Sequence, residues 1–119
     1  MNIKSFRPFL GAKDFDISRA FYQEMGFTEK VLQPGFSVFS QGSFHFYLQD
    51  AYVKDWVDNS QVFMEVDDLD GLWNKFTRYE FDRKFPGVRL SAIKKDSWGR
   101  EFFLHDPSGI LWHFGSFNA

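Results

Sequence analysis

Three histidines are the side chains of this sequence best suited to acid–base or metal chemistry. They are His45, His105 and His113, and the chain contains no cysteine. Because histidine titrates near neutral pH and ligates many metals, each is a candidate general base or metal ligand. The lack of cysteine excludes disulfides and thiolate zinc sites. A metal site in this chain would therefore depend on imidazole and carboxylate ligands.

Two pairs of carboxylates stand close together in the sequence, Asp14 with Asp16 and Asp67 with Asp68. Each pair precedes or opens a segment whose apolar residues recur with helical spacing. Aspartates at such places cap helices and complement the helix dipole, so we interpret them as structural. No Gly-x-Ser-x-Gly elbow, glycine-rich phosphate loop or His-Glu-x-x-His pattern occurs. The sequence thus holds no complete catalytic motif.

Aromatic residues make up 21% of the chain, with 17 Phe and 4 Trp. So many rings predict either an aromatic core with an oligomer interface or a ring-lined binding cleft. The net charge of −2 and the scattered basic residues argue against nucleic acid as the main partner. The N-terminal residues lack a signal-peptide pattern, and no apolar run is long enough to span a bilayer. We therefore expect a soluble, cytoplasmic protein.

Hydrophobic period and turn residues divide the first half of the chain into short elements. Residues 3–13 are expected to be extended, with Pro8 at an edge or hinge. Asp14 begins a predicted helix that ends near Met25, before Gly26. Three strands are predicted next, at about 27–33, 36–41 and 43–49. Residues 50–60 are expected to be a connecting loop with room for a helical turn.

The second half of the chain repeats the first. Residues 61–76 follow the pattern of residues 7–22, with Asp68 standing 54 residues after Asp14 and Phe76 in the place of Tyr22. This offset predicts two βαβββ repeats, about 1–50 and 61–117. The second is expected to contain a helix at 69–80, a strand near 88–94, and a hairpin of residues 100–105 and 110–115. The hairpin turn is the segment Asp106-Pro107-Ser108-Gly109.

Three segments carry a family resemblance: "AKDFDISRAFYQEMGF" at 12–27, "VDDLDGLW" at 66–73, and "SWGREFFLHDPSG" followed by "WHF" at 97–114. With them the chain resembles the bleomycin resistance proteins of the glyoxalase, or vicinal-oxygen-chelate, superfamily. The resemblance implies a single α+β domain over residues 1–119, in which two βαβββ repeats form a half-open barrel. It also implies a homodimer that exchanges its N-terminal strands, with Pro8 near the pivot.

The metal-dependent enzymes of this superfamily hold their ion at four positions. The resemblance places these at Arg7, Tyr47, Gln61 and His113. Arginine cannot lose its proton to serve as a ligand, glutamine is a poor ligand, and tyrosine would have to ionise from a pKa near 10. Only His113 is a good ligand, so we expect no metal, no cofactor and no catalytic residue.

The resemblance implies instead a cleft that grips a planar ligand between rings. Trp98 matches the family's stacking tryptophan, and Phe36 matches an aromatic residue after a Pro-Gly turn. Trp73 and Trp112 are assigned to packing, and His105 to the end of a surface strand. The residues expected to bind the ligand are Phe36, His45, Tyr47, Tyr52, Trp56, Phe63, Trp98 and His113.

The expected function is sequestration of a bleomycin-type glycopeptide antibiotic, which would confer resistance. Arg7 on the same concave face would repel a cationic drug, so two alternatives stay open. One is a relative that binds or transforms another aromatic or hydrophobic small molecule, as a lyase or dioxygenase-like enzyme would. The other is an accessory module that binds a protein partner through an exposed aromatic surface.

Overall fold

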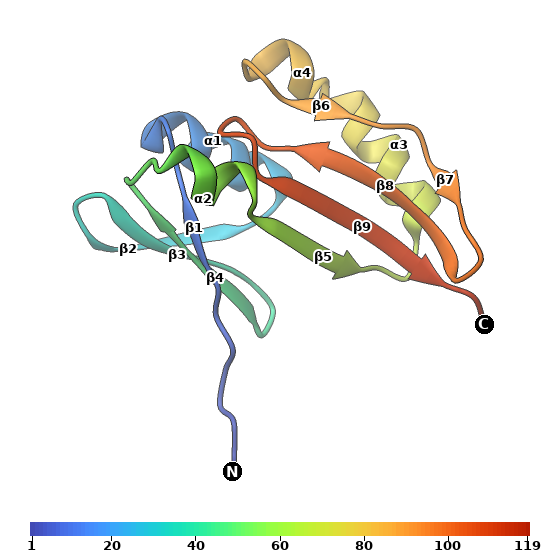
Figure 1. Ribbon diagram of the computed structural model, residues 1–119, viewed down its shortest axis with the longest axis horizontal. Helices are drawn as coiled ribbons and strands as arrows, with labels where there is room; N and C mark the ends of the chain where they lie inside the picture. The colour runs from blue at the N-terminus through green and yellow to red at the C-terminus, as the bar shows by residue number, and fades with distance from the viewer.

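The computed structural model describes residues 1–119 and contains two open sheets built on one plan (Figure 1). The first sheet has the order β1 (Phe9–Gly11), β4 (Phe44–Gln49), β3 (Phe36–Gln41), β2 (Thr28–Gln33). The second has the order β5 (Gln61–Glu65), β9 (Leu111–Phe117), β8 (Gly99–His105), β6 (Arg89–Leu90), and β7 (Lys94–Lys95) also pairs with β8. In both sheets the first and last strands of the repeat pair in parallel. The α+β class and the duplication are therefore confirmed.

Two helices of equal length carry the repeat, α1 (Phe15–Met25) and α3 (Leu69–Tyr79). Each begins at the predicted aspartate: the side chain of Asp14 accepts from Ile17 N, and that of Asp68 accepts from Gly71 N. Such caps each contribute about 1 kcal/mol. Two short helices are added, α2 (Lys54–Asp58) between the repeats and α4 (Phe81–Lys84) after α3. None of the helices has the length and apolarity needed to cross a membrane.

Two predicted strands are shorter in the structure than expected. Only Phe9–Gly11 of residues 3–13 forms a strand, because Pro8 has no N–H and the residues before it leave the body of the molecule (Figure 1). The strand expected near 88–94 is replaced by β6 and β7. Between them the Ser91 hydroxyl accepts a hydrogen bond from the Phe103 N–H and so takes the place of a backbone acceptor.

The hydrophobic core lies between the sheets and the helices. Strand alternation turns one face of each sheet toward α1 and α3. Trp112 is 2% exposed there, which confirms its assignment to packing. Phe21 of α1 contacts Phe81 and Phe85 edge-on, so both repeats share one core. The most buried strand residues of this core are Leu10, Phe39, Phe46, Leu48, Phe102, Leu104, Trp112 and Phe114.

A buried polar network joins the helix of the first repeat to the hairpin turn of the second. The Tyr22 hydroxyl donates to Asp106 Oδ2 at 2.5 Å and accepts from Trp112 Nε1 at 3.0 Å. Asp106 Oδ1 accepts from the backbone N–H groups of Ser108 and Ile110. Every polar atom of this network has a partner, which offsets the cost of burying the carboxyl group.

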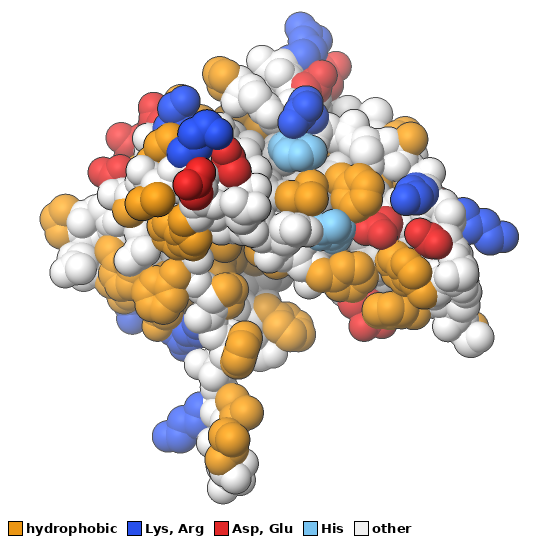
Figure 2. All heavy atoms as spheres, viewed as in Figure 1, with side chains coloured by type: hydrophobic (Ala, Val, Ile, Leu, Met, Phe, Trp, Pro, Cys, Tyr) orange, Lys and Arg blue, Asp and Glu red, His pale blue; other side chains and the backbone are white.

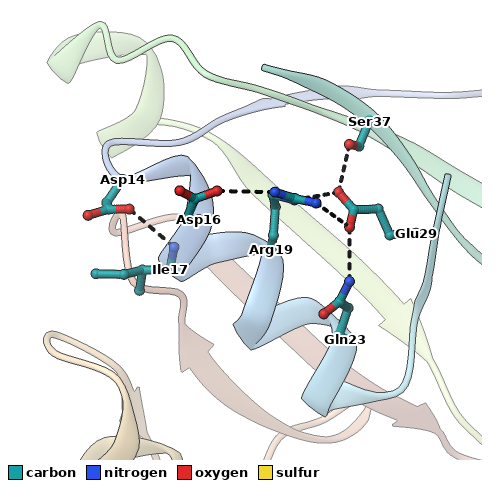
Figure 3. Close-up of polar contacts among 7 residues, drawn as sticks. All are labelled: Asp14, Asp16, Ile17, Arg19, Gln23, Glu29 and Ser37. Atoms are coloured by element: carbon teal, nitrogen blue, oxygen red, sulfur yellow. Dashed lines mark hydrogen bonds and ion pairs between the residues drawn. The ribbon is translucent and has the colours of Figure 1, made fainter. Parts of the chain in front are cut away.

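A second polar cluster fixes α1 to the first sheet (Figure 3). The Glu29 carboxylate accepts hydrogen bonds from Arg19, Gln23 and Ser37, at distances between 2.6 and 3.1 Å. Burial acts to raise the pKa of Glu29, but the hydrogen bonds from Arg19 and Ser37 outweigh it and hold that pKa below its usual range. The carboxylate therefore stays ionised and ties the helix to strands β2 and β3.

Candidate functional site: two open aromatic faces

The side of each sheet that faces away from the helices carries exposed aromatic rings. We call these sides the first face, with Phe9, Phe36 and Tyr47, and the second face, with Phe63, Trp98, His113 and Phe117. Figure 2 shows hydrophobic side chains gathered on both halves of the molecule, beside a hollow between them. The aromatic residues thus form both a buried core and an accessible surface.

On the first face, the rings of Phe9, Phe36 and Tyr47 contact one another. The ring centroid of Tyr47 is 4.8 Å from that of Phe9 and 5.2 Å from that of Phe36, and the Phe9 and Phe36 centroids are 6.2 Å apart. Arg7 lies over the same ring and donates a hydrogen bond to the Tyr47 hydroxyl at 3.2 Å. His45 shares this face, and its Nδ1 is 2.6 Å from Ser40 Oγ. Three predicted ligand residues, Phe36, His45 and Tyr47, therefore lie on one surface.

On the second face, three rings form a tight cluster. Trp98 lies 6.0 Å from Phe63 and 5.2 Å from Phe117, centroid to centroid. A Cβ atom at Gly115 would come within 2.6 Å of Phe63 Cζ and 3.3 Å of the Trp98 ring, so glycine lets both rings lie over β9. Phe63 is 45% exposed and Phe117 is 53% exposed. The cluster is held in place on one side and open to solvent on the other.

His113 stands beside this cluster. Its ring is stacked on Phe63, and Phe103 approaches it edge-on. Nδ1 is 2.9 Å from Glu101 Oε1, and Nε2 is 2.8 Å from Gln61 Oε1. The Glu101 carboxylate accepts a hydrogen bond from the Nδ1–H group and so fixes the ring orientation. Nε2 is the polar atom that a ligand would meet on displacing the exposed Gln61 side chain.

The four positions that the resemblance assigns to a metal site separate into two hydrogen-bonded pairs. Arg7 contacts Tyr47 in the first sheet, and Gln61 contacts His113 in the second. No three His, Asp or Glu side chains come together in a way that could hold an ion. A permanently charged guanidinium and an imidazole with both nitrogens engaged do not fit a divalent metal.

Tyr52 and Trp56 make no ring contact with the aromatic residues of either face. Trp56 of α2 packs against β1, where a Cβ atom at Gly11 would come 2.6 Å from its ring. Tyr52 is 40% exposed and lies beside the Lys13 ammonium group. Neither ring contacts another aromatic side chain. The contact of Tyr52 and Trp56 with a ligand stays a prediction. His105 is the last residue of strand β8, as expected.

Three side chains of the second face were not predicted as ligand residues: Glu101, Phe103 and Phe117. Strand alternation could have found them, because Glu101 and Phe103 lie two residues apart on β8 and Phe117 follows His113 and Gly115 on β9. Extending the two-residue period to the end of each strand brings all three onto the face.

Comparison with protein-family models gives no match, and comparison with curated protein sequences gives none. Solved structures match over almost the whole chain. The bleomycin-binding protein from bleomycin-producing Streptomyces verticillus, complexed with copper(II)-bleomycin, is 22% identical with a TM-score of 0.80, covering 99% of each chain. A bleomycin resistance determinant encoded on the transposon Tn5 is 20% identical with a TM-score of 0.82, covering 98% of this chain and 100% of its own.

An enzyme shares the architecture as well. The lactoylglutathione lyase from Agrobacterium tumefaciens is 18% identical with a TM-score of 0.74, covering 98% of this chain and 96% of its own. Matches at this identity establish the arrangement of the backbone and leave the ligand open. The chain has the glyoxalase/bleomycin resistance fold, which bleomycin-binding proteins and glyoxalase-type enzymes of the vicinal-oxygen-chelate superfamily share.

Proposed function

We propose that this protein binds a planar aromatic small molecule without a metal, and that a bleomycin-type glycopeptide antibiotic is the first candidate ligand. The observation that carries the proposal is the open cluster of Phe63, Trp98 and Phe117. Rings held in fixed orientations can stack on a flat ligand, and each aromatic pair adds about 0.5 to 1.5 kcal/mol beyond area burial. Sequestration of such a drug in the cytoplasm would confer resistance.

The charge on the second face supports a ligand with a cationic end. Glu65 on β5 lies opposite Gly115, next to the ring cluster, and is exposed without an ion-pair partner. A carboxylate beside aromatic faces attracts a cation more strongly than either group alone. Two of the solved structures with this fold are complexes with bleomycin or its copper(II) form. Bleomycin is therefore the ligand to test before other planar compounds.

The proposal includes a homodimer with exchanged N-terminal strands. The segment before β1 leaves the body of the molecule, and within it Ile3 is 68% exposed and Phe6 is 86% exposed (Figure 1). Burying these side chains against a partner would stabilise the assembly. Light scattering should give a dimer mass at micromolar concentration, and a monomer would contradict this part of the proposal.

Calorimetric titration with bleomycin, with and without Cu²⁺, tests the ligand. We expect a saturable one-site isotherm for each protomer, and Trp98→Ala should weaken binding about tenfold or more because one stacking surface is lost. Phe44→Ala is the matched control, since Phe44 is 77% exposed at the β3–β4 turn, away from the ring cluster. No heat at drug concentrations in the tens of micromolar would rule out a bleomycin-type ligand.

A further inference from the structure

We infer that Arg7 and Tyr47 form a binding site for an anionic group on the first face, and that the ligand of this face is a planar aromatic carboxylate. The inference rests on the proposed function, since it assumes that aromatic small molecules bind to this protein. It goes further by assigning the two faces ligands of opposite charge. The second face suits a cationic end, and the first face suits an acid.

The first observation is a pair of hydrogen-bond donors that lack acceptors. The Arg7 guanidinium carries five N–H groups and donates to two neutral hydroxyls, Ser5 Oγ and Tyr47 OH, each at 3.2 Å. No carboxylate lies within 4.0 Å of it. The Tyr47 hydroxyl accepts from Arg7, and its own proton has no acceptor. Both groups therefore offer free donors at one exposed place.

The other arginines of the chain show how unusual this arrangement is. Arg19, Arg83 and Arg100 each pair with a carboxylate. Arg78 and Arg89 have no ion pair, and neither lies over a Phe, Tyr or Trp ring, as Arg7 does over Tyr47. Arg7 combines an unpaired charge with an aromatic surface. That combination is the one required to hold a molecule that has both a ring and an acid group.

The charge of the whole face agrees with an anionic ligand. Lys30 of β2 points to the same side as Val38 and Tyr47, through the pairing of β2, β3 and β4. The acidic residue next to it, Glu29, points to the opposite side and is neutralised by Arg19. The strand residues of the first face include no carboxylate. A cation would be repelled here, whereas an anion would be attracted by Arg7 and, from two strands away, by Lys30.

The spacing of the groups suits a small fused-ring acid. Phe9 is 49% exposed, and its ring lies 4.8 Å from that of Tyr47, whose hydroxyl is bonded to Arg7. A ligand ring lying on the exposed ring of Phe9, beside Tyr47, would bring its carboxylate to the guanidinium. Arginine binds carboxylates through two parallel N–H···O bonds, which fixes the orientation of a planar ligand as well as its charge.

Three probes of the same shape and different charge test the inference. Calorimetry would compare naphthalene-2-carboxylate, naphthalene-2-carboxamide and 2-naphthylmethylammonium. We expect the carboxylate to bind at least tenfold more tightly than the amide, and the ammonium compound to bind most weakly. Arg7→Gln should remove the preference and leave the affinity for the amide unchanged. Arg78→Gln is the matched control, because it removes the same charge from the exposed surface of α3.

The outcomes separate this inference from the proposed function. If the amide or the ammonium compound binds as tightly as the carboxylate, or if Arg7→Gln keeps the preference, the anion site is wrong while aromatic binding stands. If none of the three probes binds, the anion site is again wrong, and the bleomycin titration decides the proposed function separately. Arg7 is exposed, and circular dichroism of Arg7→Gln should match that of the wild type.

Discussion

The two repeats share a scaffold and differ in the chemistry of their open faces. Both have the same strand order, and both helices begin at an aspartate cap. At the first strand, Phe9 and Phe63 stand at equivalent positions, but Arg7 of the first repeat corresponds to Gln61 of the second. The first face is basic, whereas the second carries Glu65 and Glu101. The two repeats thus share the residues that form the scaffold and differ in the charge of their outward positions.

The repeats also differ in how their parts are joined. The offset of 54 residues places Trp73 at the position of Arg19. Arg19 holds α1 to β2 through an ion pair with Glu29, whereas the Trp73 indole donates to the Ser91 carbonyl at 2.8 Å. The last hairpin of the first repeat turns at an exposed Gly42, and that of the second turns at the buried Asp106. The same fold is therefore stabilised by different contacts in each half.

The largest effect is expected at the turn of the second repeat. Replacing Asp106 with alanine removes the acceptor of the Tyr22 hydroxyl and of two backbone N–H groups, all of them buried. Unsatisfied buried donors each cost about 1 to 3 kcal/mol, so we expect the free energy of unfolding to fall by about 3 kcal/mol. Urea denaturation followed by circular dichroism measures it.

The matched change in the first repeat is Gln41→Ala, beside the exposed turn at Gly42. Exposed polar substitutions of this kind change stability by about 0.5 kcal/mol or less. If Asp106→Ala and Gln41→Ala were equally mild, the buried network would not be the contact that joins the repeats.

The scaffold could be predicted from the sequence because its signals are local. Asp14 and Asp68 cap their helices by accepting a hydrogen bond from the backbone N–H three residues later. Gly26 ends α1 with a positive φ that favours glycine. The two-residue alternation of the strands also predicts that the side chains of Tyr47 and His113 lie on the open faces of their sheets. These features depend on neighbours within one element, so a single sequence contains them.

The contacts between elements could not be predicted in the same way. Tyr22 and Asp106 are 84 residues apart, and no local pattern selects that pairing. The same holds for the hydrogen bond between His113 and Gln61, because these residues are 52 positions apart. The strand residues expected to bind a ligand could therefore be assigned to faces from alternation. Their hydrogen bonds, and the separation of Tyr52 and Trp56 from the two ring clusters, required the structure.

A smaller effect is expected on the second face. Gly115→Ala places a methyl group where the Phe63 and Trp98 rings lie, so the rings must turn away from β9. We expect the affinity for bleomycin to fall about tenfold, which corresponds to about 1.4 kcal/mol. Calorimetry would measure it, with near-ultraviolet circular dichroism to report the ring movement.

The same variant sharpens the contrast between the faces. Because Gly115 belongs to the second sheet, the preference for naphthalene-2-carboxylate over its amide should stay at the wild-type value. An unchanged bleomycin affinity despite an altered aromatic signal would show that the cluster is not the surface on which the drug stacks.

The smallest effect concerns the ion pair of the first repeat (Figure 3). Glu29→Gln weakens charge-assisted hydrogen bonds with Arg19 and should lower the free energy of unfolding at pH 7 by about 1 kcal/mol. Because the pKa of Glu29 is lowered in the folded state, its contribution is fully present above the unfolded pKa and is lost as pH falls through the folded pKa. Denaturation midpoints between pH 7 and pH 3 would reveal this loss.

The equivalent link in the second repeat provides the control. Trp73→Phe removes a neutral hydrogen bond, so it should lower stability by a similar amount at every pH and keep the acid slope of the wild type. Glu29→Gln should lower the stability and flatten that slope, since the titrating group itself is gone. If stability depended equally on pH in the wild type and in Glu29→Gln, the Arg19–Glu29 ion pair would not be a source of acid sensitivity. The first repeat would then resemble the second, in which Trp73 makes a neutral hydrogen bond.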